Sequence, residues 1–184
     1  MTQDTKPAPT IVIRPRKESD IAPLIDLLSR QQAETQYPVD WPFPIPLRDF
    51  IIRDTEVHAW VAELDGQVAG HVSVTRVEGG GDSDMAPEWT RAHGVDISQL
   101  RCISVFYTDI TKTGTGLGRR LHDVAAAQAL KEGYPVLDVV KSHEGPVRFY
   151  ENRGWKTVHV MDAPWSPAGT PIQVNLMILP RAAA

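Results

Sequence analysis

Apolar residues occur along the chain in short, separated runs, and their spacing predicts a mixed fold of strands and helices. β-rich runs are "IVIRP" from residue 11, "HAWVAELDGQVAGHVSVTRV" from residue 58 and "LRCISVFYTD" from residue 100. The second run is divided by Asp65-Gly66, a dipeptide that favours tight turns, and therefore predicts a β-hairpin. The third is apolar throughout its middle, which indicates a central strand buried on both faces.

Helical spacing follows the first strand and recurs later in the chain. Isoleucine and leucine occupy positions i, i+3, i+4 and i+7 over residues 21–28, which marks the buried face of a helix. A second helix is expected to end at Gly133, and a third, "VRFYENR", lies between Pro146 and Gly154. With the short strands "VLDVV", "TVHVMDA" and "IQVNLMILP", the order is β-α-β-β-β-α-β-α-β-β. This order places the chain in the α/β (α+β) class.

Three segments lack this periodicity. Residues 1–10 are polar and contain proline, which predicts a flexible tail, and residues 78–99 predict an inserted loop with three consecutive glycines. Residues 37–46, "YPVDWPFPIP", contain four prolines, which exclude regular structure, although Trp41 and Phe43 are costly to leave in water. This loop is either attached to the core by its aromatic rings or forms a pocket wall.

The composition fits one compact domain, which we expect over residues 11–180. Of the 184 residues, 42% are hydrophobic and 23% charged, and the net charge of -4 argues against a dedicated nucleic-acid surface. The single cysteine, Cys102, excludes an internal disulfide and a cysteine-rich zinc site, and its apolar run predicts a buried thiol. No segment resembles a signal peptide or a membrane span. We therefore expect a cytoplasmic protein with no metal, no nucleic acid and no membrane partner.

The segment "TDITKTGTGLGRRLHDVAAAQAL" contains Gly114, Gly116 and Gly118 at alternate positions. Glycine adds no packing and costs backbone entropy, so this run needs another explanation. The first amides of a helix lack internal acceptors, and the helix dipole adds positive charge there. Glycines at a strand-to-helix junction, with Lys112 and Arg119 beside them, therefore predict a phosphate site that ligand oxygens reach without obstruction by a Cβ.

The spacing of the glycines does not match two common nucleotide-binding motifs. A P-loop that starts at Gly114 requires its second glycine where the chain has Arg119. A dinucleotide fingerprint fails at the same residue or, from Gly116, at Leu121, although Asp138 lies where a ribose-binding acid is expected. The hypothesis of a nucleotide-binding regulator is therefore supported by the glycines alone.

The glycine spacing resembles the acyl-CoA loop of the GNAT superfamily of N-acetyltransferases, whose signature is Q/R-x-x-G-x-G/A at a strand-to-helix junction. Here that frame is "TGTGLG", with Thr113 at the place of the Gln or Arg. A second GNAT motif is a short strand and a helix that ends in Tyr before Gly-Phe or Gly-Trp. It is matched by "VLDVVKSHEGPVRFYENRGW". The resemblance covers about residues 11–179, with the motifs in family order.

The resemblance implies a mixed, mostly antiparallel central sheet flanked by helices, with acetyl-CoA as acyl donor. It places the pantetheine arm and thioester carbonyl on backbone amides of the fourth strand, around Phe106, Tyr107 and Thr108. At the place of His143 the family commonly has asparagine. His143 either donates a hydrogen bond to the cofactor in its stead or is a surface histidine at a helix start. The loop implied to bind the rest of acetyl-CoA comprises Thr113, Gly114, Thr115, Gly116, Leu117, Gly118 and Arg119.

The resemblance also assigns a role to Tyr150, which matches the family tyrosine that protonates the departing CoA thiolate. The alternative is a ring that packs against the cofactor without transferring a proton. The acceptor amine must lose a proton before it attacks. Asp109, Glu88 and His93 are candidates for that base, a water chain would serve as well, and we assign none.

The expected reaction is direct attack of a primary amine, from a small molecule or a protein, on the acetyl group. Trp41 and Phe43 are expected to line the acceptor site, together with Glu88 and Asp109. The alternative is a non-catalytic acyl-CoA-binding or sensing module of the same fold, since Thr113 removes a long polar side chain from the loop. A homodimer is left open.

Overall fold

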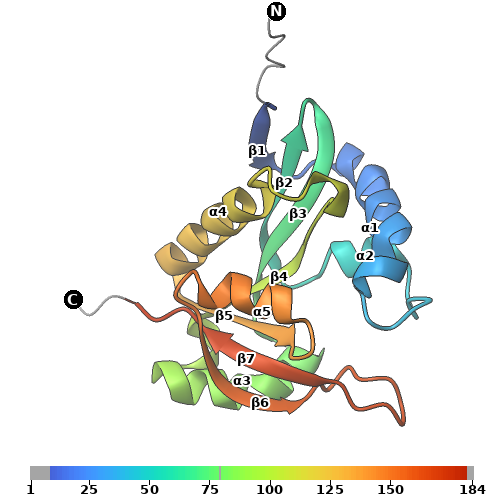
Figure 1. The fold of residues 1–184 in the computed structure, drawn as a ribbon. Helices are drawn as coiled ribbons and strands as arrows, with labels where there is room; N and C mark the ends of the chain where they lie inside the picture. The colour runs from blue at the N-terminus through green and yellow to red at the C-terminus, as the bar shows by residue number, and fades with distance from the viewer. Residues whose placement is uncertain (1–8, 79, 182–184) are drawn as a thin grey trace, which may run out of the picture.

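The computed structural model describes residues 9–78 and 80–181, so residues 1–8 of the expected tail lie outside it. In this part of the chain, seven strands form one sheet in the order β1-β2-β3-β4-β5-β7-β6 (Figure 1). The strands are β1 (Ile11–Pro15), β2 (Glu56–Leu64), β3 (Gln67–Arg76), β4 (Leu100–Thr108), β5 (Tyr134–Val140), β6 (Lys156–Asp162) and β7 (Gln173–Ile178).

The helices of the same described residues connect these strands. The α-helices are α1 (Ile21–Thr35), α2 (Leu47–Ile51), α3 (Gly80–His93), α4 (Leu117–Glu132) and α5 (Glu144–Glu151), with short 3-10 turns η1 (Glu18–Asp20), η2 (Ile97–Gln99) and η3 (Ile110–Lys112). The predicted order of strands is confirmed, and α2 and α3 are added to it.

The sheet opens between its central strands. β4 and β5 are parallel and pair only through Leu100–Cys102 and Tyr134–Val136, whereas the other neighbouring strands are antiparallel. Beyond these pairs, β5 turns away from β4, and α4 makes the crossover that a parallel pair requires (Figure 1). The expected central position of β4 and the mostly antiparallel sheet are confirmed. The resulting V-shaped opening lies at the carboxyl ends of both strands.

Helices cover both faces of the sheet. α4 and α5 pack on one face, in a cluster that contains Leu137 of β5. α3 packs in another cluster with the adjacent residue Val136, so it lies on the opposite face, because neighbouring strand residues point in opposite directions. α1 and α2 pack with Val61, which pairs with His71 on that same opposite face. The opening between β4 and β5 is therefore bordered by α4 and α5 on one side and by α1, α2 and α3 on the other.

The expected loop over residues 78–99 is wrong for most of its length, because residues 80–93 form α3. Met85 and Trp89, one helical turn apart, have no exposed surface and pack against the sheet. Pro87 lies inside the helix, and Thr90 bonds its hydroxyl to the Pro87 carbonyl. Proline and the glycine run masked a helix that tertiary packing stabilises.

Candidate active site

The edge of β4 that faces β5 is unpaired beyond Cys102. The amide of Asp109 donates to the carbonyl of Ala69 on β3. Because successive amides of a strand point to opposite sides, the N–H groups of Phe106 and Thr108 point toward β5, where the described residues offer no strand partner. The predicted amide site on the fourth strand is thus geometrically available at two of its three residues. The third, Tyr107, pairs with His71, and its buried hydroxyl donates to Leu24.

A β-bulge shapes this edge. Val105 has a φ of 48°, and the register between β3 and β4 shifts between His71 and Ser73. A β-branched residue in the left-handed region costs about 1–3 kcal/mol, so the surroundings must hold it there. The bulge bends β4 between its first half, which pairs with β5, and its second half, whose edge toward β5 is open.

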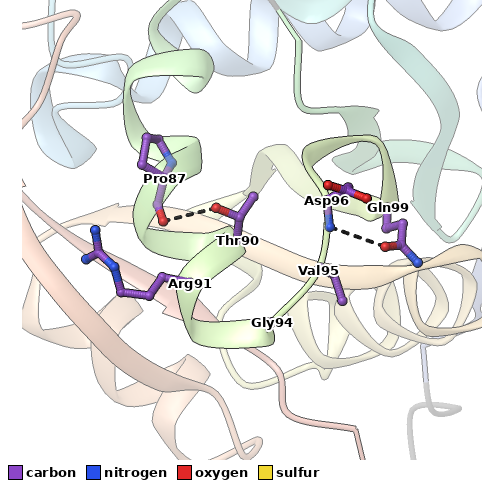
Figure 2. A pocket seen from close by; sticks show the side chains of 7 residues that line it. All are labelled: Pro87, Thr90, Arg91, Gly94, Val95, Asp96 and Gln99. Carbon is purple, nitrogen blue, oxygen red and sulfur yellow. Dashed lines mark hydrogen bonds between the residues drawn. The ribbon is translucent and has the colours of Figure 1, made fainter.

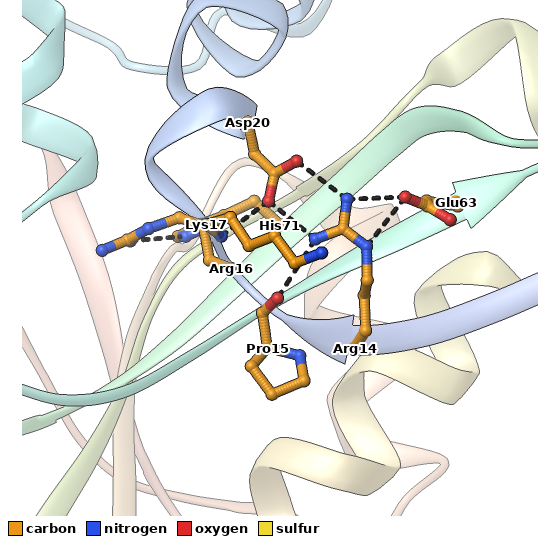
Figure 3. Close-up of polar contacts among 7 residues, drawn as sticks. All are labelled: Arg14, Pro15, Arg16, Lys17, Asp20, Glu63 and His71. Atoms are coloured by element: carbon orange, nitrogen blue, oxygen red, sulfur yellow. Dashed lines mark hydrogen bonds and ion pairs between the residues drawn. The ribbon is translucent and has the colours of Figure 1, made fainter.

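His71 supplies that support from the α1 side of the sheet. Its side chain has no exposed surface, and its Nδ1 lies 2.7 Å from the carbonyl oxygen of Val105. Arg16 Nη1 lies 3.0 Å from Nε2 of the same ring, and Arg16 also pairs with Glu56 (Figure 3). A carbonyl only accepts and a guanidinium only donates, so the proton lies on Nδ1. Burial lowers the pKa of His71 to about 3, which keeps the ring neutral.

A second ion cluster fixes the start of α1 beside this network (Figure 3). Arg14 donates to both carboxylate oxygens of Asp20, each at 2.8 Å, and also pairs with Glu63 of β2. The hydrogen bond from Arg14 lowers the pKa of Asp20. These bonds join β1, β2 and η1. They therefore fix the start of α1 to the sheet on the face opposite α4 and α5.

The glycine turn that follows η3 provides unpaired amides. Gly114 and Gly116 have φ angles of 84° and 89°, and a Cβ at either would meet no atom within 4 Å. These two glycines therefore provide the left-handed turn and leave open space in front of it. Gly118 is helical, and its Cβ would contact Phe106 and Phe149 at 3.9 and 3.8 Å. These are ordinary contact distances, so a role of Gly118 in close ligand approach stays a prediction.

The start of α4 has the features of an anion site. Among the described residues, no protein acceptor takes the N–H groups of the turn and first helical turn, namely Gly114, Gly116, Leu117, Gly118 and Arg119. The hydroxyls of Thr113 and Thr115 donate to the carbonyls of Ile110 and Lys112 and so shape the turn. Lys112 and Arg119 are exposed at its rim. Free amides, a helix dipole and two cations together suit a phosphate group.

Tyr150 lies beside the open edge of β4. Its ring is 6.3 Å from that of Phe106, 6.1 Å from His122 and 5.8 Å from Trp155. Its side chain is 8% exposed, and no described residue makes a hydrogen bond with its hydroxyl. Burial raises the pKa of Tyr150 far above the usual value for a phenol, so the group remains a proton donor at neutral pH.

The structure separates the three candidate bases. Asp109 lies at the end of β4, next to the glycine turn. Burial alone would raise the pKa of Asp109, but hydrogen bonds from Thr111 and the ion pair with Arg30 lower it overall. Glu88 pairs with Arg91 and with His159 of the outer strand β6.

His93 lies at the end of the sheet where β4 and β5 still pair. It contacts the Pro135 carbonyl at 3.1 Å and the ring of Tyr134, and burial lowers its pKa. His143 lies at the opposite end, where it precedes α5, and its amide donates to Val140. Of the candidate bases, Asp109 alone lies at the open end of the V, and its lowered pKa makes it a weak base.

The proline-rich loop has one attached and one exposed ring. Phe43 packs on Phe50 of α2 with ring centroids 4.7 Å apart, and Tyr37 packs on Phe50 and Tyr107. Trp41 is 40% exposed. Phe43 therefore attaches the loop to the core, whereas a pocket wall that includes Trp41 stays a prediction.

A depression of about 590 Å³ lies elsewhere, between the end of α3 and η2. Figure 2 shows two of its polar contacts, from Thr90 to Pro87 and between Asp96 and Gln99, as already satisfied within the protein. It contains none of the predicted site residues and lies beside the closed end of the V. Its lining residues are Pro87, Thr90, Arg91, Gly94, Val95, Asp96 and Gln99.

One residue of the open end was not assigned to the site from the sequence. Asp138 lies in β5, two positions after the last residue that pairs with β4. The sequence feature that could have indicated a role for Asp138 is a carboxylate inside the otherwise apolar strand "VLDVV". Among the described residues, no group of three or more His, Cys, Asp or Glu side chains is arranged to bind a metal, and no helix is long and apolar enough to cross a membrane.

Comparison with known proteins agrees with this geometry. The model of the acetyltransferase (GNAT) family matches residues 24–155, which include β4, the glycine turn and Tyr150. The chain belongs to the GNAT acetyltransferase family. The resemblance expected from the sequence is confirmed, whereas no curated protein matches this GNAT sequence significantly.

Solved structures share the GNAT fold of this chain. The ribosomal-protein-S18-alanine N-acetyltransferase from Escherichia coli has a TM-score of 0.65 and 14% identity, over 95% of this chain and 96% of that one. An N-acetyltransferase from Staphylococcus aureus Mu50 has a TM-score of 0.69 and 15% identity, over 92% and 98%. The structure of yncA from Salmonella typhimurium with its cofactor acetyl-CoA has a TM-score of 0.65 and 16% identity, over 95% and 96%. At these identities the likeness concerns the fold.

Proposed function

We propose that this GNAT protein is an N-acetyltransferase that transfers the acetyl group of acetyl-CoA to a primary amine of a small molecule or a protein. The observation that carries the proposal is the presence of two groups of unpaired amides at one opening. One group lies in the glycine turn, and the other comprises Phe106 and Thr108 on the open edge of β4. Family membership and the similar fold of a structure solved with acetyl-CoA support it.

The residues present fit both ends of acetyl-CoA. Open space and free amides at Gly114 and Gly116 suit the pyrophosphate. The hydroxyl of Thr113 is bonded within the turn, so it does not replace the longer Gln or Arg of the family motif. Lys112 and Arg119 provide the positive charge instead. The thioester end suits the open edge of β4. The amides of this edge are free to donate to a ligand as they would to a neighbouring strand.

The geometry suggests how the chain would promote acyl transfer. Acetyl-CoA supplies an activated thioester, and the amides of Phe106 and Thr108 would polarise its carbonyl as preorganised dipoles. Holding both reactants in one opening removes much of the entropic barrier to their reaction. Tyr150 stays protonated because burial raises its pKa, and its position beside Phe106 supports a role as the donor that would protonate the leaving sulfur.

Acetyl-CoA turnover with a panel of primary amines tests the proposal. Release of CoA is followed with a thiol reagent, and mass spectrometry identifies the acetylated product. Cys102 is 2% exposed, so it should not interfere with the thiol assay. A non-catalytic acyl-CoA sensor would bind acetyl-CoA in a calorimeter but release no CoA with any amine. A nucleotide-binding regulator would instead bind ATP or NAD in competition with CoA.

A further inference from the structure

Asp138 occupies a position that the reaction described above does not use. It lies two residues beyond Val136, where pairing between β4 and β5 ends. Residues two apart in a strand share a face, and Val136 packs with α3. Asp138 therefore faces the side covered by α1, α2 and α3, while Tyr150 approaches the same opening from the α5 side.

Asp138 lies near a second carboxylate. Its side chain is partly exposed, and no described residue forms an ion pair with it or with Asp82 of the first turn of α3. Burial and the charge of Asp82 raise the pKa of Asp138 to about 6, whereas the charge of Arg53 and hydrogen bonding by Trp165 act in the opposite direction. Asp138 and Asp82 thus share the charge of one guanidinium, that of Arg53.

A second observation comes from the other face of the sheet. Tyr150 is 8% exposed as a residue, and its hydroxyl makes no hydrogen bond with any described residue. The pKa of Tyr150 is raised mainly by burial and also by the charges of Tyr37 and Asp138. The charge of Asp138 thus disfavours ionisation of this hydroxyl. A carboxylate without an ion-pair partner and a hydroxyl without a hydrogen-bond partner, among the described residues, thus border one opening from opposite faces.

We propose that Asp138 binds the ammonium group of the acceptor and takes up its proton. The inference rests on the proposed function, and it defines the acceptor as an amine that is protonated in solution, such as an aliphatic amine or a lysine side chain. Asp82 strengthens the attraction for that cation. Asp138 is also a stronger base than an ordinary aspartate, because its neighbours favour the protonated form.

The proposed step balances in protons and bonds. One proton moves from the ammonium nitrogen to Asp138, which leaves a neutral amine with a lone pair. The lone pair forms a C–N bond to the acetyl carbon, the C–S bond breaks, and the sulfur leaves as a thiolate. Tyr150 gives its proton to the thiolate and receives the second proton of the nitrogen as the amide forms. Asp138 then releases its proton to water.

The test uses Asp138→Asn, which keeps the shape and removes the base, and Asp82→Asn, which removes only a neighbouring charge. Asp96→Asn is the matched control, because Asp96 is an exposed carboxylate at the closed end of the V. For each full-length protein, kcat/KM is measured from pH 5 to 9 with cadaverine, spermidine and a lysine-containing peptide. Calorimetry gives the acetyl-CoA affinity, and circular dichroism reports folding.

We expect Asp138→Asn to lower kcat/KM by about 100-fold or more and to abolish its rise between pH 5 and 7. The acetyl-CoA affinity should stay within about twofold. Asp82→Asn should move that rise to lower pH, because removing a like charge lowers the pKa of Asp138, and Asp96→Asn should match the wild type. If Asp138→Asn folds poorly, the shift in Asp82→Asn decides the question.

Two outcomes overturn the inference and are distinguishable. If wild-type protein turns over an amine and Asp138→Asn keeps its rate within about threefold, or keeps the same rise with pH, Asp138 has no such role. If the wild type binds acetyl-CoA but releases no CoA with any of the amines, the proposed function itself fails, and this inference fails with it.

Discussion

The ring of His71 donates a hydrogen bond to the carbonyl oxygen of Val105 over 2.7 Å, within a site that water does not reach. This contact joins β3 to the bulge of β4, immediately before the amides of Phe106 and Thr108. The other ring nitrogen accepts from Arg16, so the orientation of the ring is set from both sides. The contact couples a buried polar network to the edge on which the proposed function depends.

Replacing His71 by Phe should therefore damage the site beyond its effect on stability. The variant loses a buried hydrogen bond and leaves Arg16 without one partner, which should cost about 1–3 kcal/mol of unfolding free energy. The Val105 bulge should relax, so kcat should fall at saturating acetyl-CoA. His71→Gln retains an N–H donor and should recover part of kcat. Equal kcat values in folded wild-type and His71→Phe protein would show that the bulge does not depend on this bond.

The same residue predicts a pH dependence of stability. The folded protein holds the pKa of His71 at about 3, below the usual value near 6.5, because burial disfavours the charged ring. The unfolded chain therefore binds more protons, and the stability due to the neutral ring, complete above pH 6.5, is lost progressively as the pH falls toward 3. Urea unfolding at pH 7, 6 and 5 should show this decline. The decline should be smaller in His71→Phe, and identical slopes would contradict the prediction.

Gly116→Val tests the glycine turn. Gly116 precedes α4 with a φ of 89°, which a β-branched residue rarely adopts, although nothing in the protein lies within 4 Å of its Cβ. The variant should weaken CoA binding at least about tenfold, because the turn must change and the new side chain fills the space before the amides. Gly169→Val, at another left-handed glycine with an open Cβ direction, is the matched control and should bind CoA normally. Unchanged CoA affinity in folded Gly116→Val would refute the assignment of the turn.

Tyr150→Phe tests the proton donor. The ring and its contacts with Phe106 and Trp155 remain, so CoA binding should change little. Turnover should fall by about 100- to 10,000-fold if proton transfer to the thiolate limits the rate. A loss below about threefold, with the chemical step shown to limit turnover, would assign Tyr150 to packing alone.

How far the sequence determined these features depends on the range of the interactions involved. The hairpin at Asp65-Gly66, the central position of β4 and the turn before α4 depend on local chemistry, and all were predictable. The helix α3 was missed because Met85 and Trp89 gain their stability from distant strands, while Pro87 and the glycines favour a loop locally. The bulge at Val105 in β4 was likewise not predictable.

The site shows the same division between local and long-range information. The amides of the glycine turn follow from its residues. The bulge at Val105 is hydrogen-bonded by His71, 34 positions earlier in the chain. Asp138 acquires its surroundings only when Asp82 and Arg53, distant in sequence, approach β5. No window of the sequence contains that information.

The acceptor side is tested by two aromatic residues of the same loop. Trp41 is 40% exposed, whereas Phe43 packs against Phe50 in the core. If Trp41 lines the amine site, Trp41→Ala should raise KM for the amine about three- to tenfold and leave the acetyl-CoA affinity and Tm nearly unchanged. Phe43→Ala should lower Tm, because it removes a ring that attaches the loop to the core. The loop's prolines restrict its backbone, so little conformational entropy is lost when a ligand binds Trp41. Measuring Tm and both KM values in the two variants separates the roles, and equal effects of Trp41→Ala on the two substrates would exclude Trp41 from the acceptor site.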